Sequence, residues 1–186
     1  MAKEKPITNA QLKKSLQGLS QADLISLITD ISQTCPKAKE FLTIRFTSEN
    51  PSEVLEKYKQ KVRDQFFPKR GYGKLKLREA KKAISDFKTI CKDKTMIIDI
   101  TLYFVENCVE FIGEYGDISE NFIIAATDLY EQVVKLINAG GESLYLKFSD
   151  RLISAAENSG DGYGLRDDLM GLYSEINWVE NDDDDE

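Results

Sequence analysis

The sequence predicts an all-α protein, and three observations support this prediction. Only 4 Pro and 11 Gly occur in 186 residues, which leaves long stretches without a helix breaker. Apolar residues recur at steps of three and four along most of the chain, as they do on the buried face of a helix. No segment shows the sustained alternation of apolar and polar residues that is typical of a strand.

The composition is that of a globular chain, with 41% hydrophobic and 31% charged residues. The length fits one domain with one core. We therefore expect about nine helices, packed as antiparallel hairpins in a single domain over residues 1–179. The pattern leaves open whether these hairpins wind into a superhelix. Residues 180–186 hold six acids and are expected to form a disordered acidic tail.

Two short amphipathic helices are expected to open the chain. Leu12, Leu16 and Leu19 follow helical spacing in the first. Ser20 and Asp23 have the spacing of an N-cap and its acidic capping partner, which predicts that the second helix begins after Ser20. The apolar face of this second helix consists of Leu24, Leu27, Ile28 and Ile31.

Proline residues indicate where the next two helices begin. Pro36 opens a third helix, over about residues 38–46. Asn50 and Pro51 supply an N-cap and a first-position proline for a fourth, which has to end near Pro68. The residues of the fourth helix expected to point inward are Leu55, Tyr58, Val62 and Phe66.

A basic loop separates the fourth helix from a fifth. Residues 68–73 contain Lys69, Arg70 and Tyr72 between glycines and a proline. The fifth helix follows, with an apolar stripe formed by Leu77, Ala80, Ile84, Phe87 and Cys91. A sixth helix, at about residues 95–115, is apolar around most of its circumference, and such a helix is usually buried.

Three more helices complete the expected fold. The seventh follows Ser119 and ends at the glycine pair 140–141. The eighth covers about residues 142–157, and the ninth covers about residues 165–178. Trp178 closes the ninth helix and is expected to plug the core.

The charges are divided unevenly between the two halves of the chain. Residues 1–94 carry 21 Lys and Arg against 11 Asp and Glu, whereas residues 95–186 carry 4 against 21. On the fifth helix, five cations lie within an arc of about 80° at 100° per residue. A comparable arc of the sixth helix carries acids. The cations are Lys74, Arg78, Lys81, Lys88 and Lys92, and the acids are Asp99, Glu106, Glu110, Glu114 and Asp117.

We interpret these two arcs as a structural charge ladder across an antiparallel hairpin. Residues that face each other in such a hairpin have position numbers with a nearly constant sum, and four pairs give sums of 187 or 188. An exposed pair contributes only about 0–1 kcal/mol, so the ladder would act on register more than on stability. The predicted pairs are Lys74 with Glu114, Arg78 with Glu110, Lys81 with Glu106 and Lys88 with Asp99.

Nucleic-acid binding through the basic segment 69–92 is an alternative interpretation of the same cations. A cationic helix beside Lys69, Arg70 and Tyr72 could follow a phosphate backbone while the aromatic ring stacks on a base. The net charge of −7 and the nearby glutamates disfavour this alternative. A further alternative is that the acidic tail docks on this basic face as an intramolecular competitor.

The chain contains no His, which removes the commonest general base and the usual metal ligand. An enzyme would need a pocket of convergent carboxylates such as Glu106 and Glu110 with raised pKa values. No cofactor motif or metal-ligand spacing is present, so we expect neither a cofactor nor a metal. We expect Cys35, Cys91 and Cys108 to be small core residues of a reducing, cytoplasmic protein, with no membrane segment.

Four stretches of the sequence resemble an uncharacterised family of small bacterial proteins, common in the Bacteroidetes, that is known only as a domain of unknown function. The stretches are residues 66–71, 81–87, 109–111 and 114–118. The resemblance implies a helical cytoplasmic protein and transfers no active site.

The function that we expect is therefore unknown in detail and non-catalytic. A helical binding or scaffold protein with an unknown protein partner is favoured over nucleic-acid binding and over an enzyme. Lys69, Arg70 and Tyr72 form the candidate binding surface, because loops on rigid helical scaffolds often carry recognition. These two cations could instead cap helix ends or pair with Glu114 and Asp117. The oligomeric state stays open.

Overall fold

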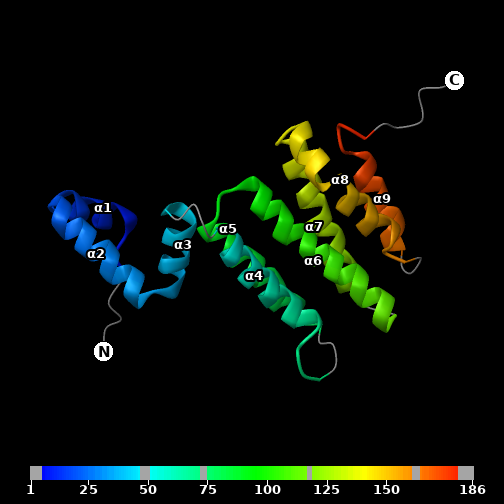
Figure 1. Cartoon of the computed structure of the whole chain (residues 1–186), viewed down its shortest axis with the longest axis horizontal. Coiled ribbons are helices and arrows are strands. Elements are labelled where there is room, and N and C mark those ends of the chain that lie inside the picture. The colour runs from blue at the N-terminus through cyan, green and yellow to red at the C-terminus, as the bar shows by residue number, and fades with distance from the viewer. Residues whose placement is uncertain (1–5, 47–50, 72–74, 117–118, 161–163, 180–186) are drawn as a thin grey trace. The chain divides into compact units, whose positions relative to one another are not determined.

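The structure is a computed structural model that describes residues 6–46, 51–71, 75–116, 119–160 and 164–179. These residues form nine helices and no strand (Figure 1), so the all-α prediction is confirmed. None of the described helices is both long enough and apolar enough to cross a membrane. The helices are α1 Asn9–Gln17, α2 Gln21–Thr34, α3 Pro36–Phe46, α4 Pro51–Phe66, α5 Leu77–Ile90, α6 Lys94–Tyr115, α7 Glu120–Asn138, α8 Glu142–Glu157 and α9 Leu165–Ser174.

The chain divides into two compact units, Met1–Glu49 and Asn50–Glu186. The N-terminal unit contains α1–α3 and the C-terminal unit contains α4–α9. The prediction of one domain over residues 1–179 stays a prediction.

Local capping signals set the helix starts in the N-terminal unit. Thr8 and Gln11 form a capping box at α1, and Ser20 and Asp23 form the predicted one at α2. The proline at position 36 is the first residue of α3. None of the residues of these three helices is buried.

The C-terminal unit is built around α6, which packs against α4, α5, α7 and α8 (Figure 1). Nine of its 22 residues are buried, among them the polar Thr101 and Asn107. Thr101 donates its hydroxyl to the carbonyl of Ile97, and the Asn107 side-chain amide donates to the carbonyl of Tyr103. The prediction that this helix is buried is therefore confirmed.

An aromatic cluster joins the end of α4 to α6 and α7. The ring of Phe66 is 1% exposed, and its centroid lies 5.2 Å from that of Phe104 and 6.3 Å from that of Phe111. Phe122 of α7 adds a third edge-on contact with Phe66 at 6.4 Å. Aromatic pairs in these tilted geometries contribute about 0.5–1.5 kcal/mol beyond the area that they bury.

Two expectations about single residues are corrected. Cys91 and Cys108 are buried as expected, but Cys35 is exposed, because it follows α2 in a unit without a buried core. The last helix ends at Ser174 rather than near Trp178. The Trp178 ring instead stacks on Tyr145 of α8, with centroids 6.4 Å apart, and stays partly exposed.

We predict that Phe66→Ala destabilises the C-terminal unit by about 3–5 kcal/mol, because it leaves a cavity among three other rings. The measurement is urea unfolding followed by circular dichroism. The matched control is Leu146→Ala in the same unit, since the Leu146 side chain is 66% exposed and should cost little. Equal midpoints for the two variants would show that the aromatic cluster does not hold this unit together.

Candidate functional site

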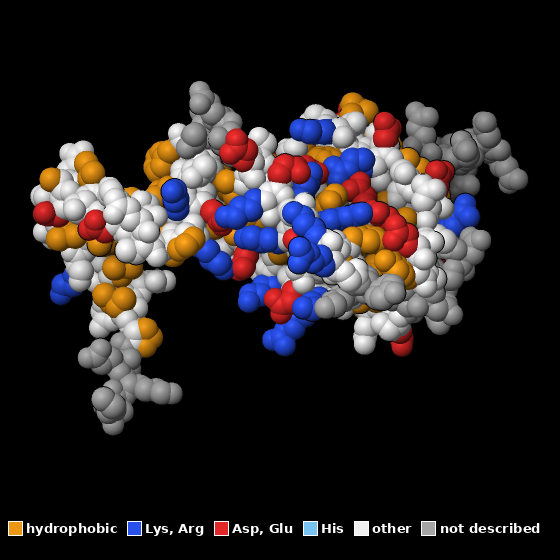
Figure 2. Space-filling view, turned by 60° about the horizontal axis from the view of Figure 1, so that its bottom comes forward, with side chains coloured by type: hydrophobic (Ala, Val, Ile, Leu, Met, Phe, Trp, Pro, Cys, Tyr) orange, Lys and Arg blue, Asp and Glu red, His pale blue; other side chains and the backbone are white. Residues whose placement is uncertain are grey.

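Lys and Arg side chains gather on one face of the C-terminal unit, with Asp and Glu among them (Figure 2). A groove of about 890 Å³ lies between α4 and α5. Its lining combines cationic, acidic and apolar side chains. The lining residues are Lys61, Gln65, Leu75, Lys76, Leu77, Arg78, Glu79, Lys82, Ala83 and Asp86.

The groove exists because the two helices contact each other through their apolar stripes. α4 buries Val62 and Phe66, and α5 buries Ala80 and Ala83 beside the groove. The small side chain of Ala83 belongs to the lining, so the two helices can approach closely while the long polar side chains diverge. The backbone N–H of Lys76 donates to the carbonyl of Gln65 at 3.4 Å and ties the two helix ends together.

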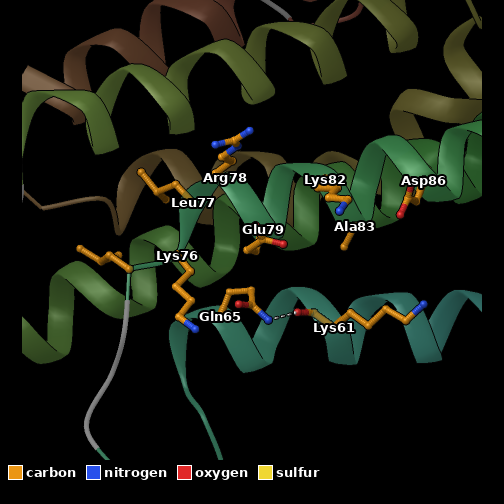
Figure 3. A pocket seen from close by; sticks show the side chains of 10 residues that line it. Lys61, Gln65, Lys76, Leu77, Arg78, Glu79, Lys82, Ala83 and Asp86 are labelled. Carbon is orange, nitrogen blue, oxygen red and sulfur yellow. Dashed lines mark hydrogen bonds between the residues drawn. The ribbon is translucent and has the colours of Figure 1, made fainter. Parts of the chain in front are cut away.

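The charge of the groove is mostly positive. Four cations, Lys61, Lys76, Arg78 and Lys82, outnumber two acids, Glu79 and Asp86, in the lining. Figure 3 shows Lys76 and Lys82 directed toward the α4 side, and Arg78 pointing away from it. The Nζ atom of Lys61 lies 3.7 Å from the centroid of the Tyr58 ring, which orients its ammonium group.

The first turn of α5 adds to this positive potential. Its N-cap residue is Lys76, which makes no side-chain capping hydrogen bond. The N–H groups at the start of a helix carry a partial positive charge, and here they lie beside basic side chains. The groove therefore favours negatively charged groups at this end.

The predicted binding loop is only partly described, and its described residues do not line the groove. Lys69 and Arg70 are exposed in the segment that joins α4 to α5, and neither pairs with Glu114 in the described part of the chain. Tyr72 and Lys74 lie outside the described residues, as do Asp117 and the acidic tail. Lys61 and Gln65 were not predicted as site residues. The constant sum of position numbers in an antiparallel hairpin, applied to α4 and α5, would have placed them opposite residues 76–82.

Three of the four predicted pairs in the charge ladder are wrong, namely those of Arg78, Lys81 and Lys88. Asp99 pairs with Lys59 at 2.8 Å and with Arg151 at 2.6 Å, and Arg151 also binds Glu106 at 2.6 Å. Glu110 forms a two-pronged ion pair with Arg63. The acids of α6 thus meet cations of α4 and α8 rather than those of α5.

The physical reason is the position of α5, whose cations reach toward α7. Lys81 lies 3.9 Å from Asp128, and Lys88 donates to the Gln132 side chain at 3.1 Å. Arg78 lines the groove instead of pairing with Glu110. Lys74 lies outside the described residues, so its predicted pair with Glu114 stays a prediction.

Glu110 of α6 lacks the raised pKa that the enzyme alternative would need. Glu106 and Glu110 line a cavity of about 340 Å³ together with Arg151. Hydrogen bonds from Arg63 lower the pKa of Glu110, whereas a general acid at neutral pH needs a raised one. Burial raises the pKa of Asp99, but hydrogen bonds from Lys59 and Arg151 outweigh burial and leave this pKa below its ordinary value. These ion pairs are best explained as structural.

A second groove of about 450 Å³, between α7 and α9, is acidic. Its carboxylates come from Asp128, Glu131, Asp167, Asp168 and Glu175. Within the described ranges, no group of three or more Cys, Asp or Glu side chains is arranged to hold a metal ion.

Residues 7–161 match the model of a family described as "Family of unknown function (DUF6155)". This match confirms the prediction of an uncharacterised family. No curated protein and no solved structure matches the chain.

We predict that Arg151→Met destabilises the fold by about 1–3 kcal/mol, because Asp99 and Glu106 lose charged hydrogen bonds in a half-buried position. The measurement is again urea unfolding at pH 7. The control is Lys135→Met, which removes an exposed pair with Glu131 one helical turn away and should cost about 0–0.5 kcal/mol. If the two variants are equally stable, the α6 ion pairs contribute no more than surface pairs.

The pH dependence of stability should also report on Asp99. Folding lowers the pKa of this carboxyl, so the unfolded state binds more protons as the pH approaches the ordinary Asp value. The contribution of Asp99 is complete above about pH 5 and is lost as the pH falls through the folded-state pKa. We expect Asp99→Asn to be less stable at pH 7 and to lose less stability between pH 5 and pH 3 than the wild type. Parallel curves would contradict this role.

Proposed function

The chain belongs to the family of unknown function DUF6155, and we propose that it is a non-catalytic binding protein whose α4–α5 groove takes a segment of another protein. The segment would carry acidic side chains next to apolar ones. The observation that carries the proposal is the mixed lining of the groove: four cations beside Leu75 and Leu77.

The dimensions of the groove support a peptide-like occupant. From Lys76 to Asp86 it follows about three turns of α5, which corresponds to roughly 15 Å. Leu75 is 39% exposed at one end and offers an apolar anchor, while Lys76 and Lys82 offer charge-assisted hydrogen bonds. A short acidic and apolar helix or strand would match both kinds of group.

The acids inside the groove favour a protein partner over nucleic acid. Glu79 and Asp86 lie among the cations and would repel a continuous phosphate backbone. A protein segment can place a basic or neutral side chain opposite each of these acids, whereas a phosphate chain cannot. Nucleic-acid binding is therefore the alternative outcome of the test below.

We also propose that the protein is cytoplasmic, because of its cysteines. Its three cysteines are free thiols, and Cys91 and Cys108 are buried in the core, where burial raises the pKa of each thiol. Unpaired cysteines are typical of proteins in reducing compartments.

A photo-crosslinking amino acid at Leu75 would test the proposal in cells of the source organism. We expect it to trap one protein, identified by mass spectrometry, and Lys76→Glu/Lys82→Glu to weaken binding of that protein at least tenfold in a titration. The control is Lys92→Glu/Lys135→Glu, which makes the same change in net charge at exposed positions outside the groove.

Two results would contradict the proposal. One is a crosslink to the same protein that survives in Lys76→Glu/Lys82→Glu. The other is a crosslink to nucleic acid together with late elution from heparin that the same substitutions abolish, because this result would make phosphate the ligand.

A further inference from the structure

Three lysines gather where α5 ends and α6 begins. Lys88 lies in the last turn of α5, and Lys92 and Lys94 lie on either side of Asp93, the N-cap residue of α6. The Nζ atom of Lys92 donates to the backbone carbonyl of Lys88 at 2.9 Å, which keeps these two side chains together. Lys88, Lys92 and Lys94 are called the lysine cluster below. None of them lines the α4–α5 groove, so the cluster is a separate basic surface.

The ammonium groups of the lysine cluster donate to neutral oxygens rather than to carboxylates. Lys88 donates to the side-chain amide of Gln132 at 3.1 Å, and Lys92 donates to a carbonyl of its own helix. Lys94 donates to the backbone carbonyl of Ala139 at 3.2 Å. None of the three forms an ion pair with an acid of the described ranges. Their positive charges therefore have no counter-charge in direct contact among these residues.

The one acid between these lysines in the sequence already has a structural role. The side chain of Asp93 accepts a hydrogen bond from the backbone N–H of Met96 at 3.0 Å. A carboxylate in this position offsets the partial positive charge at the start of a helix. Burial lowers the pKa of Lys88, as expected for an ammonium group that has no carboxylate beside it. The lysine cluster therefore favours anionic groups that come from elsewhere.

The described part of the chain ends beside the lysine cluster. The backbone N–H of Asn177 donates to the side-chain oxygen of Asn138 at 3.1 Å, and the Asn138 amide donates to the carbonyl of Glu175 at 3.0 Å. These two hydrogen bonds fasten the segment after α9 to the last residue of α7. Lys94 is bound to the carbonyl of Ala139, the next residue along the chain. Asn177 and Lys94 therefore contact the end of α7 at neighbouring residues, whose Cα atoms are about 3.8 Å apart.

The acidic tail has the charge and the length to reach this surface. Six of the seven residues 180–186 are acids. Seven residues span at most about 23–25 Å when extended. Lys88 lies one helical turn, about 6 Å, from Lys92, so the whole cluster is within this reach. The tether also keeps the local concentration of the acids in the millimolar range.

We propose that the acidic tail docks on the lysine cluster of the same chain and keeps the anionic groups of other molecules away from it. The contact is electrostatic and exposed, so salt should weaken it as the screening length becomes shorter. The proposal goes beyond the α4–α5 groove and does not depend on a partner that binds there.

Amide NMR spectra of the full chain test the docking. We expect Lys92→Gln/Lys94→Gln to move the signals of residues 182–186 to the positions that they take in the wild type at high salt. Lys92→Arg/Lys94→Arg keeps the charges and should leave these signals near their wild-type positions. The matched control is Lys69→Gln/Lys147→Gln, which makes the same change in net charge at exposed positions outside the cluster.

Lys147 makes this control stringent. It lies two residues from Tyr145, whose ring stacks on Trp178, so a single lysine close to the end of the described chain is removed as well. Tail signals that do not respond to salt in the wild type would overturn the proposal, and so would equal movements in the Lys69→Gln/Lys147→Gln variant. Signals that move when the wild type is diluted tenfold would also overturn it, because the tail would then bind a second copy.

Elution from heparin, used as a polyanion probe, tests the shielding. Replacing the four aspartates 182–185 by asparagine should delay elution relative to a variant of equal net charge in which four other exposed acids are replaced by glutamine. Adding Lys92→Gln/Lys94→Gln should abolish the delay. Equal elution of the two variants would show that the tail does not shield the cluster. The four control positions are Glu53, Glu114, Glu120 and Glu157.

Discussion

The burial of α6 is the constraint on which the C-terminal unit depends. A 22-residue helix with apolar side chains on most of its circumference has to be surrounded, and four other helices pack against it. The acids of α6 then need cations from the surrounding helices beside them. Arg151 meets this need for both Asp99 and Glu106, and Arg63 meets it for Glu110. Unpaired carboxylates at the half-buried positions of Asp99 and Glu106 would cost more than the pairs contribute, so these ion pairs favour the observed approach of α4 and α8 to α6.

This use of cations explains why the α4–α5 groove keeps its positive charge. Lys59 and Arg63 on one side of α4 are committed to α6, whereas Lys61 lies on the side that lines the groove. On α5, Lys81 and Lys88 face α7, while Lys76 and Lys82 belong to the groove. The surplus of cations in the first half of the chain is therefore divided between holding α6 and presenting a basic surface. The proposed binding groove and the ion pairs around α6 therefore have the same origin in the sequence.

Local signals in the sequence were sufficient to predict the helices but not the partners of their charges. The capping pattern of Ser20 and Asp23, the prolines at 36 and 51 and the glycines at 140 and 141 act within one or two turns, and each predicted boundary lies close to the observed one. The choice of Arg151 as a partner for Asp99, 52 residues away, depends on which helices become neighbours, and periodicity carries no such information. The ladder arithmetic assumed that α5 and α6 face each other through their charged sides. The predicted pairs were consistent with one another, but the packing of the helices gives Asp99, Glu106 and Glu110 other partners.

The two units show that capping and burial are separate requirements. α1 and α2 have complete capping boxes and yet bury no residue, whereas α5 has no side-chain cap and buries five. Caps decide where a helix begins, but burial of the apolar face supplies most of its stability in a folded protein. The caps of α1 and α2 therefore set where these helices begin, but the burial that stabilises α4–α9 is missing from them.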